Sequence, residues 1–334
     1  MKDTQKYVIE KRKSLGVSQK ELALLLGMKE AGERTVRGWE SGEHKPSATR
    51  LAKLEALNST HPFEHSNKDS DFTFIDLFAG IGGIRLPFQK QGGKCVFTSE
   101  IDKHAQKTYF ANYGEYPSGD ITQIQAKDIP NHDLLLAGFP CQAFSIAGYR
   151  QGFNDEQGRG NLFFELVRIL ETKKPRVAFF ENVKNLVSHD SGNTFRVICS
   201  ELERLGYKYL FQVFNASEYG NIPQNRERIY IVAFKNKKDY ANFELPKSIP
   251  LETTIHDVID FSKKQDDKFY YTSEKNKFFD ELKENMTNHD TTYQWRRVYV
   301  RENKSNLVPT LTANMGTGGH NVPLILHIAE IFVN

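Results

Sequence analysis

The sequence predicts an α/β protein: a mostly parallel, doubly wound sheet, preceded by a small all-α domain and followed by a smaller, irregular domain. Three observations predict this organisation. Residues 5–57 carry short helical patterns, apolar strands alternate with helical stretches from Phe72 onward, and residues 240–325 lose that rhythm and become rich in Lys, Asn and Gly. Strands that alternate with helices are typical of a parallel sheet, because the helices form the crossovers.

The composition is that of a globular protein. Of its 334 residues, 39% are hydrophobic and 26% are charged. Apolar runs are far shorter than the ~20 residues of a membrane helix, and the N-terminal residues do not look like a secretory signal. Cys95, Cys141 and Cys199 lie far apart without the spacing of a zinc site, so we expect a reduced, cytoplasmic protein.

The charge is unevenly distributed. Residues 1–70 hold 13 Lys and Arg against 10 Asp and Glu, which accounts for the whole net charge of +3. The excess indicates an anionic partner for the N-terminal part, although an ordinary solvated surface would carry the same charge.

The N-terminal helices have recognisable start and stop signals. Ser18-Gln19-Lys20-Glu21 predicts a capping box, and Gly27 is predicted to end that helix. A second helix is predicted over Glu33–Glu40, and Ser47 is predicted to cap a third. The apolar residues expected on these three helices are Leu22, Leu25, Leu26, Val36, Trp39, Leu51, Leu54 and Leu57.

Two short helices joined by a glycine-containing turn are the layout of a helix-turn-helix DNA reader. Leu15–Ala23 and Trp39–Gly42 resemble the phage-repressor-like family of such domains, and the second helix begins with Arg34, Thr35 and Arg37. We therefore expect these three residues to contact DNA, with residues 1–57 as the DNA-binding domain. A plain helical packing module is the alternative. Residues 58–71 have no periodicity and read as a linker.

The sheet begins directly after this linker and is assigned to residues 72–239. The predicted strands are Phe72–Phe78, Lys94–Ser99, Leu134–Ala137, Val177–Phe180 and Ile229–Phe234, and the predicted helices include Asn161–Thr172 and Thr194–Leu205.

A glycine-rich turn, Phe78-Ala79-Gly80-Ile81-Gly82-Gly83, follows the first strand, where glycines let a ligand approach the backbone. Arg85 stands where a dinucleotide fingerprint has its third glycine, and no P-loop lysine follows, so NAD is disfavoured. Glu100 ends the next strand, where a carboxylate can hold two ribose hydroxyls, and Asp120 can accept from an adenine amine. The pattern predicts a site for an adenosyl cofactor.

Reactive side chains follow later strands. Cys141 lies in a proline-containing loop after Leu134–Ala137, Glu181 follows Val177–Phe180, and Arg226 and Arg228 precede the last strand. Because the carboxyl ends of parallel strands share one edge of a sheet, a thiolate, an acid and two guanidiniums are expected there. Taken singly, each has a structural alternative: a buried apolar cysteine, a helix-capping carboxylate and a surface ion-pair ladder.

Four segments in this order resemble the DNA cytosine-5 methyltransferases over about residues 72–325. Phe78–Gly83 is similar to the family's adenosylmethionine turn, Pro140-Cys141-Gln142 to its nucleophile loop, Glu181-Asn182-Val183 to its acid motif, and Gln224–Arg228 to its arginine motif. The resemblance implies a Rossmann-like sheet, S-adenosylmethionine as methyl donor, a cytosine flipped out of double-stranded DNA, and no metal. The implied cofactor residues are Phe78, Gly80, Gly82, Gly83, Glu100, Ile101, Asp120, Ile121 and Pro140.

The resemblance also implies roles in the reaction. Cys141 adds to carbon 6 of cytosine and activates carbon 5, Glu181 stabilises the adduct at N3, and Arg226 and Arg228 position the base. Residues 293–323 look like a target-recognition segment, similar to members with an N-terminal helix-turn-helix that methylate sites of the CCNGG type. The expected DNA contacts outside the N-terminal domain are Gln142, Ser145, Arg296, Arg297, Thr310 and Asn314.

The C-terminal end departs from the family pattern. Only Leu326–Asn334 follow the recognition domain, and none of these residues matches the family's last motifs. We therefore expect either a truncated chain or a second polypeptide that complements it. The function expected is methylation that protects host DNA from a cognate restriction enzyme, with residues 1–57 binding operator DNA to regulate transcription. The alternative is an inactive chain that acts only as a DNA-binding regulator or as half of a split methyltransferase.

Overall fold

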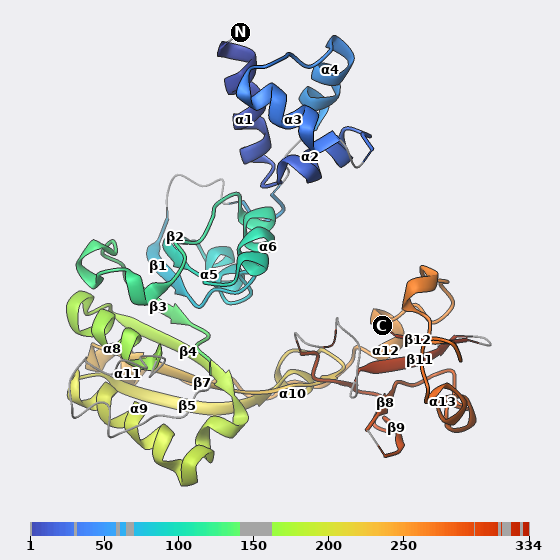
Figure 1. Cartoon of the computed structure of the whole chain (residues 1–334). Coiled ribbons are helices and arrows are strands. Elements are labelled where there is room, and N and C mark those ends of the chain that lie inside the picture. Colours follow the sequence, from blue (N-terminus) through green and yellow to red (C-terminus); the bar gives the residue numbers. More distant parts are fainter. Residues whose placement is uncertain are drawn as a thin grey trace. The chain divides into compact units, whose positions relative to one another are not determined.

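The computed structural model describes residues 2–29, 32–57, 61–64, 70–140, 162–296, 298–312, 315, 322–327 and 330–333. These residues belong to two compact units (Figure 1). The first comprises Met1–Glu181, His189–Tyr209 and Val232–Ala241, and the second comprises Asn182–Ser188, Leu210–Ile231 and Asn242–Asn334. Among the described residues, no helix is both long and apolar enough to cross a membrane.

Four helices form the N-terminal part of the first unit: α1 (Lys2–Ser14), α2 (Gln19–Leu25), α3 (Gly32–Ser41) and α4 (Ala48–Ala56). The capping box predicted at Ser18 is confirmed, because the Ser18 hydroxyl accepts from the Glu21 amide at 3.2 Å and the Glu21 carboxylate accepts from the Ser18 amide at 2.6 Å. Gly27 has the left-handed φ of +72° expected of a helix stop. Ser47 caps α4, as predicted.

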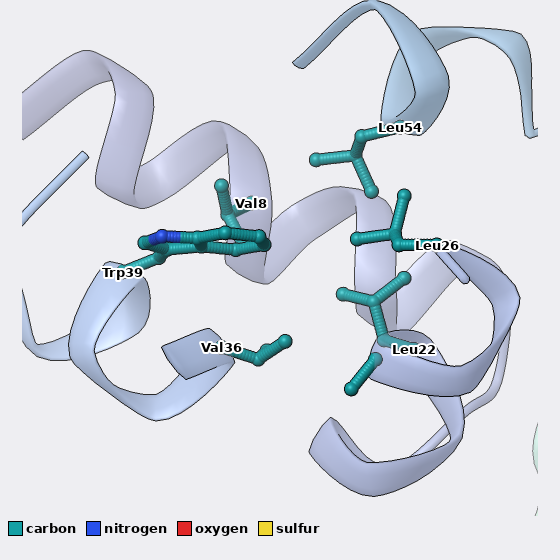
Figure 2. Close-up of a cluster of buried hydrophobic side chains, with 7 residues drawn as sticks. Val8, Leu22, Leu26, Val36, Trp39 and Leu54 are labelled. Carbon is teal, nitrogen blue, oxygen red and sulfur yellow. The ribbon is translucent and has the colours of Figure 1, made fainter. Parts of the chain in front are cut away.

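A small apolar core holds these helices together (Figure 2). Its buried residues are Val8, Leu22, Ala23, Leu26, Val36, Trp39 and Leu54. The expectation that Leu25 joins them is wrong, since its side chain is 53% exposed. At 100° per residue, Leu22, Ala23 and Leu26 share one face of α2, and Leu25 lies about 100° from the centre of that face.

A six-stranded sheet follows, with the order β2-β1-β3-β4-β7-β5. Its strands are β1 (Phe72–Leu77), β2 (Gly93–Ser99), β3 (Leu134–Ala137), β4 (Val177–Val183), β5 (Lys208–Asn215) and β7 (Glu227–Phe234). The pairings β1–β2, β1–β3 and β3–β4 are parallel, as predicted. Strand β5 was not predicted, because it is an edge strand without fully buried side chains and has no strong apolar alternation. Strands β4, β5 and β7 each have residues in both units.

Helices connect these strands. They are α5 (Arg85–Lys90), α6 (Lys103–Tyr113), α8 (Leu162–Lys173) and α9 (Asn193–Arg204), with short 3-10 turns η1 (Ile121–Gln123), η2 (Ala126–Asp128), η3 (Lys184–Val187) and η4 (His189–Gly192). Helix α11 (Lys237–Asn242) follows β7, the last strand of this sheet. The predicted helices over 161–172 and 194–205 correspond to α8 and α9 within one residue.

The described part of the predicted linker is packed. The amide of Phe63 donates to the Asn112 carbonyl at 2.9 Å, and the Phe63 ring lies 5.8 Å from the Tyr113 ring. Gln89 also donates to the Phe63 carbonyl at 2.6 Å. Phe63 thus packs against α6, although it lies in a segment whose composition had indicated a linker.

The second unit contains a four-stranded sheet with the order β12-β11-β8-β9. Its strands are β8 (Tyr293–Trp295), β9 (Val300–Glu302), β11 (Pro323–His327) and β12 (Glu330–Val333); β6 (Gln224–Asn225) and β10 (Val308–Pro309) form a separate parallel pair. The helical elements are α10 (Ala216–Tyr219), α12 (Ile255–Val258), η5 (Asp267–Phe269) and α13 (Phe279–Asn285).

This sheet corrects the expectation of an irregular domain followed by a separate tail. The expected boundary after Ile325 falls inside β11, and β12 pairs with β11 in antiparallel register, with Ile325 opposite Phe332. Three- to five-residue strands give too short an alternation to be recognised in sequence.

Candidate functional site

The glycine turn begins at the end of β1 in a backbone conformation that favours glycine. Phe78 has φ +53°, Gly80 +55° and Gly82 +90°. A Cβ on Gly82 would collide with the Tyr113 ring, whereas a Cβ on Gly80 or Gly83 would have no atom of the described residues within 4 Å. Gly82 is therefore required by packing, and Gly80 and Gly83 border open space that a ligand can occupy.

Helix α6 and strand β2 hold this turn in place. The Tyr113 hydroxyl donates to the Gly82 carbonyl at 2.6 Å, and Asn112 donates to the Ile81 carbonyl at 2.9 Å. The Ala79 amide donates to the Ser99 carbonyl at 3.1 Å. The turn is thus rigid before any ligand arrives, which lowers the entropic cost of binding.

Glu100 connects the turn to α6. One carboxylate oxygen accepts from the Gly80 amide and the other from the Asp102 amide, both at 2.8 Å. Each oxygen of an ionised carboxylate has a second lone pair, so Glu100 can still accept from two further hydroxyls. Ile101 follows Glu100, and 67% of its surface is exposed. The Ile101 side chain therefore offers an apolar surface next to the Glu100 carboxylate.

Asp120 lies in a neighbouring loop. Its Oδ1 accepts from the amide and the hydroxyl of Thr122, each at 2.9 Å, so it caps η1. The Ser99 hydroxyl donates to the Gly119 carbonyl at 2.6 Å, which ties this loop to the end of β2. Ile121 is buried. An open glycine turn with carboxylates at successive loops has the donors and acceptors that an adenosyl group requires.

The loop after β3 begins beside Glu181. Glu181 Oε2 lies 3.5 Å from the position that a Cβ on Gly138 would occupy, so the carboxylate packs against this backbone. Phe139 is buried and Pro140 is exposed. Cys141, Gln142 and Ser145 lie outside the described residues. Gly138, which packs against Glu181, stands three positions before Cys141 in the sequence.

The two arginines belong to the second unit. Arg226 Nη1 donates to the Leu311 carbonyl at 3.5 Å, and Arg228 Nη1 donates to the Glu227 carbonyl at 2.8 Å. Strand β7 begins at Glu227, so Arg228 lies within the strand that had been predicted to start after it. Lys184 pairs with Glu227 at 2.6 Å.

The expected recognition residues are spread over the second unit. Arg296 follows β8, and its amide donates to the Tyr299 carbonyl at 2.9 Å, while Val298 at the tip of this hairpin is 82% exposed. Thr310 directly follows β10 and donates its hydroxyl to the Asn225 carbonyl at 2.7 Å. Arg297 and Asn314 lie outside the described residues.

In the helical bundle, Arg34 and Arg37 are exposed on α3, Thr35 is half-buried, and Arg37 pairs with Glu33 at 2.9 Å. Glu40, near the end of α3, accepts from Arg12 and from Gln19, the latter at 2.7 Å. These contacts hold α1, α2 and α3 together and leave the arginine-bearing face of α3 open.

Sequence reasoning missed a buried polar cluster behind the glycine turn. Asp76 of β1 is fully buried, and neither of its oxygens has a hydrogen-bond partner among the described residues. Burial raises the pKa of Asp76 to about 8. Arg85 is buried nearby, donates to the Tyr109 hydroxyl at 2.9 Å and pairs with Glu115. The sequence does contain a signal of this cluster, because Asp76 is a charged residue within the otherwise apolar strand Phe72–Leu77.

Within the described residues, no cluster of three or more His, Cys, Asp or Glu side chains is arranged to hold a metal ion. The acids at the sheet edge instead accept from backbone amides and hydroxyls.

An α/β sheet whose first strand enters an open glycine turn, with a carboxylate at the end of the next strand, defines an enzyme class that binds a nucleotide-like cofactor at this edge. The chain belongs to the C-5 cytosine-specific DNA methylase family, whose model matches residues 72–329. A helix-turn-helix model matches residues 8–63.

Individual relatives of this chain are also named methyltransferases. The chain is 57% identical to Type II methyltransferase M.Bsp6I of Bacillus sp. (strain RFL6), over 75% of this chain and 79% of that protein. It is 48% identical to Type II methyltransferase M.SsoII of Shigella sonnei, over 76% of this chain, and 51% identical to Type II methyltransferase M.HhaI of Haemophilus parahaemolyticus, over 58%. These matches span 66% and 59% of the two relatives' lengths.

Among solved structures, the fold resembles that of a mutant of Spodoptera frugiperda DNMT2. The TM-score is 0.50 at 25% identity, and the match covers 59% of this chain and 62% of that one.

Proposed function

We propose that this chain transfers a methyl group from S-adenosylmethionine to carbon 5 of a cytosine in double-stranded DNA. The observation that carries the proposal is the glycine turn, held open at Gly80 and Gly83 and bonded to Glu100, within a chain of the cytosine methylase family. Bound there, S-adenosylmethionine would supply an electrophilic methyl group.

The residues that would hold this cofactor follow from their contacts. Glu100 would accept from the ribose hydroxyls with the lone pairs left after Gly80 and Asp102 are satisfied. Ile101 would cover the adenine with its exposed side chain, and Asp120 would accept from the adenine amine. The donor set of the Gly80 turn fits this group.

The covalent step would belong to Cys141. Its thiolate would add to carbon 6 of a flipped cytosine, which moves electron density toward carbon 5 and N3. Glu181, held against Gly138, would stabilise the adduct by donating at N3. Once carbon 5 is methylated, loss of its proton would expel the Cys141 thiolate and restore the aromatic ring.

The remaining roles are electrostatic. Arg226 and Arg228 would position the base carbonyl, and the exposed hairpin carrying Arg296 would contact base edges in the major groove. We propose that the methylated sequence is protected from a cognate restriction enzyme.

The experiment that tests this proposal is a methyl-transfer assay with labelled S-adenosylmethionine and random-sequence duplex DNA, followed by nucleoside analysis. Label in 5-methylcytosine, lost in Cys141→Ala, supports the proposal. Label in another nucleoside, or no transfer either by the chain alone or with a relative's C-terminal segment added, contradicts it.

A second function is favoured by the open face of α3. We propose that residues 1–57 bind operator DNA through Arg34, Thr35 and Arg37, because a helix-turn-helix model matches this part and both arginines are exposed. The test is whether Cys141→Ala, which is expected not to methylate, still binds a DNA fragment that contains the promoter. Unchanged binding separates this function from catalysis.

A further inference from the structure

The helical bundle contacts helix α6 of the sheet through a glycine. Gly16, between α1 and α2, has φ +66°, and a Cβ there would overlap the Phe110 ring. The Tyr116 hydroxyl donates to the Gly16 carbonyl at 3.2 Å, and the Tyr116 ring stacks on the Phe110 ring at 4.3 Å. The His61 ring meets the Phe110 ring edge-on at 5.1 Å. Phe110 is thereby buried between the bundle and the rest of the first unit.

An ion pair accompanies this aromatic contact. The Lys107 ammonium of α6 donates to Glu21 Oε1 of α2 at 3.1 Å, and both side chains are about half exposed. The hydrogen bonds from Ser18, together with the Lys107 ammonium, lower the pKa of Glu21 to about 2, so this carboxylate is ionised at neutral pH. An ammonium group has three donors, so Lys107 can bind a further anion while it stays paired with Glu21.

The pair lies on the helix that approaches the DNA backbone. In a helix-turn-helix the first helix crosses the backbone and the second enters the major groove, and these helices correspond to α2 and α3. Glu21 belongs to the first turn of α2. A cation that is paired with Glu21 is therefore next to the helix that crosses the phosphates.

The charges of α6 suit a phosphate backbone. Lys103 and Lys107 are four residues apart and share one face of the helix, and both are exposed. His104 is also exposed, and none of the eleven residues of α6 is acidic. A row of cations without compensating acids attracts a polyanion.

We propose that α6 is part of the operator-binding surface, and that Lys107 contacts an operator phosphate next to the site bound by residues 1–57. Such a contact is electrostatic and reads no bases, so it adds affinity to whichever sequence α3 selects. This inference rests on the proposed operator binding by residues 1–57 and does not depend on methyl transfer.

Lys107→Ala in the full chain tests the contact. Gel-shift titrations on a duplex that contains the promoter are run at several salt concentrations. The operator Kd should rise about threefold to tenfold, and the slope of log Kd against log salt should fall by about one, since one phosphate contact releases about one counterion. Lys107→Arg keeps the charge and should restore both quantities. An unchanged Kd or an unchanged salt slope in Lys107→Ala overturns the proposal.

Two controls accompany this variant. Lys127→Ala, at an exposed lysine of η2 in the same unit, should leave the operator Kd and the salt slope unchanged. Methylation of a site outside the promoter should proceed equally in Lys107→Ala and the wild type. A parallel loss of that methylation overturns the assignment of Lys107 to the operator.

Glu21→Gln separates a phosphate contact from an ion pair that only supports the fold. Glutamine preserves the capping box with Ser18 and removes the charge that pairs with Lys107. If Lys107 contacts a phosphate, Lys107→Ala weakens operator binding in the Glu21→Gln background as well. If the loss disappears in that background, Lys107 acts through Glu21 alone, and the proposal is overturned.

The failure of this inference can be distinguished from that of the proposed operator binding. If the wild type binds the promoter and loses binding when Arg34 and Arg37 are replaced with Ala, the proposed function stands. Normal binding by Lys107→Ala then refutes the contact with α6 alone. If the wild type does not bind the promoter duplex at any salt concentration, both are refuted.

Discussion

Glu100 Oε2 accepts a hydrogen bond from the Gly80 amide at 2.8 Å, so the end of β2 and the turn after β1 form one bonded unit. The same carboxylate accepts from the Asp102 amide at the start of α6. Glu100 is thus both a candidate ligand for the ribose and a part of the scaffold that shapes the cofactor turn.

Glu100→Ala removes this double acceptor. We expect S-adenosylmethionine affinity to fall by about 1.5–3 kcal/mol, roughly tenfold to hundredfold in Kd, the scale of a hydrogen bond to a charged group. Calorimetric titration measures the change, with Glu55→Ala as a control at an exposed acid of the same unit. Equal affinity in Glu100→Ala and the wild type would remove Glu100 from the site.

The glycines of the turn should respond differently to an added methyl group. Gly82→Ala forces a residue with φ +90° against the Tyr113 ring, so we expect the melting temperature to fall by several degrees. Gly83→Ala enters open space, so stability should hold while cofactor affinity drops. Melting curves and titrations distinguish the two, and unimpaired cofactor binding by Gly83→Ala would show that the open space is not the ligand's.

Asp76 should make stability depend on pH. Its pKa rises from 3.8 to about 8 in the folded state, so between these values the folded protein holds a proton that the unfolded chain has lost. The free energy of unfolding therefore decreases as pH rises through this window, by at most about 1.4 kcal/mol per pH unit. Asp76→Asn cannot titrate, and its stability relative to the wild type should increase from pH 5 to pH 8. Parallel denaturation profiles of the two proteins over this range would contradict the assignment.

Arg34 and Arg37 should govern promoter binding and leave methylation unaffected. Replacing both with Ala is expected to cost roughly 1–3 kcal/mol per lost bidentate base contact. Gel-shift titrations at fixed salt measure the effect, because the phosphate contribution varies steeply with salt. Lys53→Ala on α4 is a control that removes a positive charge elsewhere in the bundle. Normal promoter binding by the double variant would make residues 1–57 a structural appendage.

Much of the fold could be predicted because its signals are local. Ser18 and Glu21 form a capping box within four residues, and the apolar run Leu134–Ala137 can be recognised without knowing its neighbours. The turn Phe78–Gly83 was likewise found from glycine spacing alone.

What escaped prediction depends on contacts between distant residues. The bond from Thr310 to Asn225 joins positions 85 apart, and the burial of Asp76 results from packing on several elements. Leu25 was misplaced because the direction of a seven-residue helix face is set by what packs on it. The residues after Ile325 were expected to form a separate tail, because β12 can be recognised only from its pairing with β11.

In the proposed reaction, Cys141 bonds covalently to the target cytosine. A duplex carrying 5-fluorocytosine at the methylated position tests it most directly, because fluorine cannot leave as a cation and the adduct persists after methyl transfer. With S-adenosylmethionine present, mass spectrometry of the digested complex should find the modified base on the peptide containing Cys141, and none in Cys141→Ala. A base attached to another residue, or methylated cytosine produced at the wild-type rate by Cys141→Ala, would contradict the account.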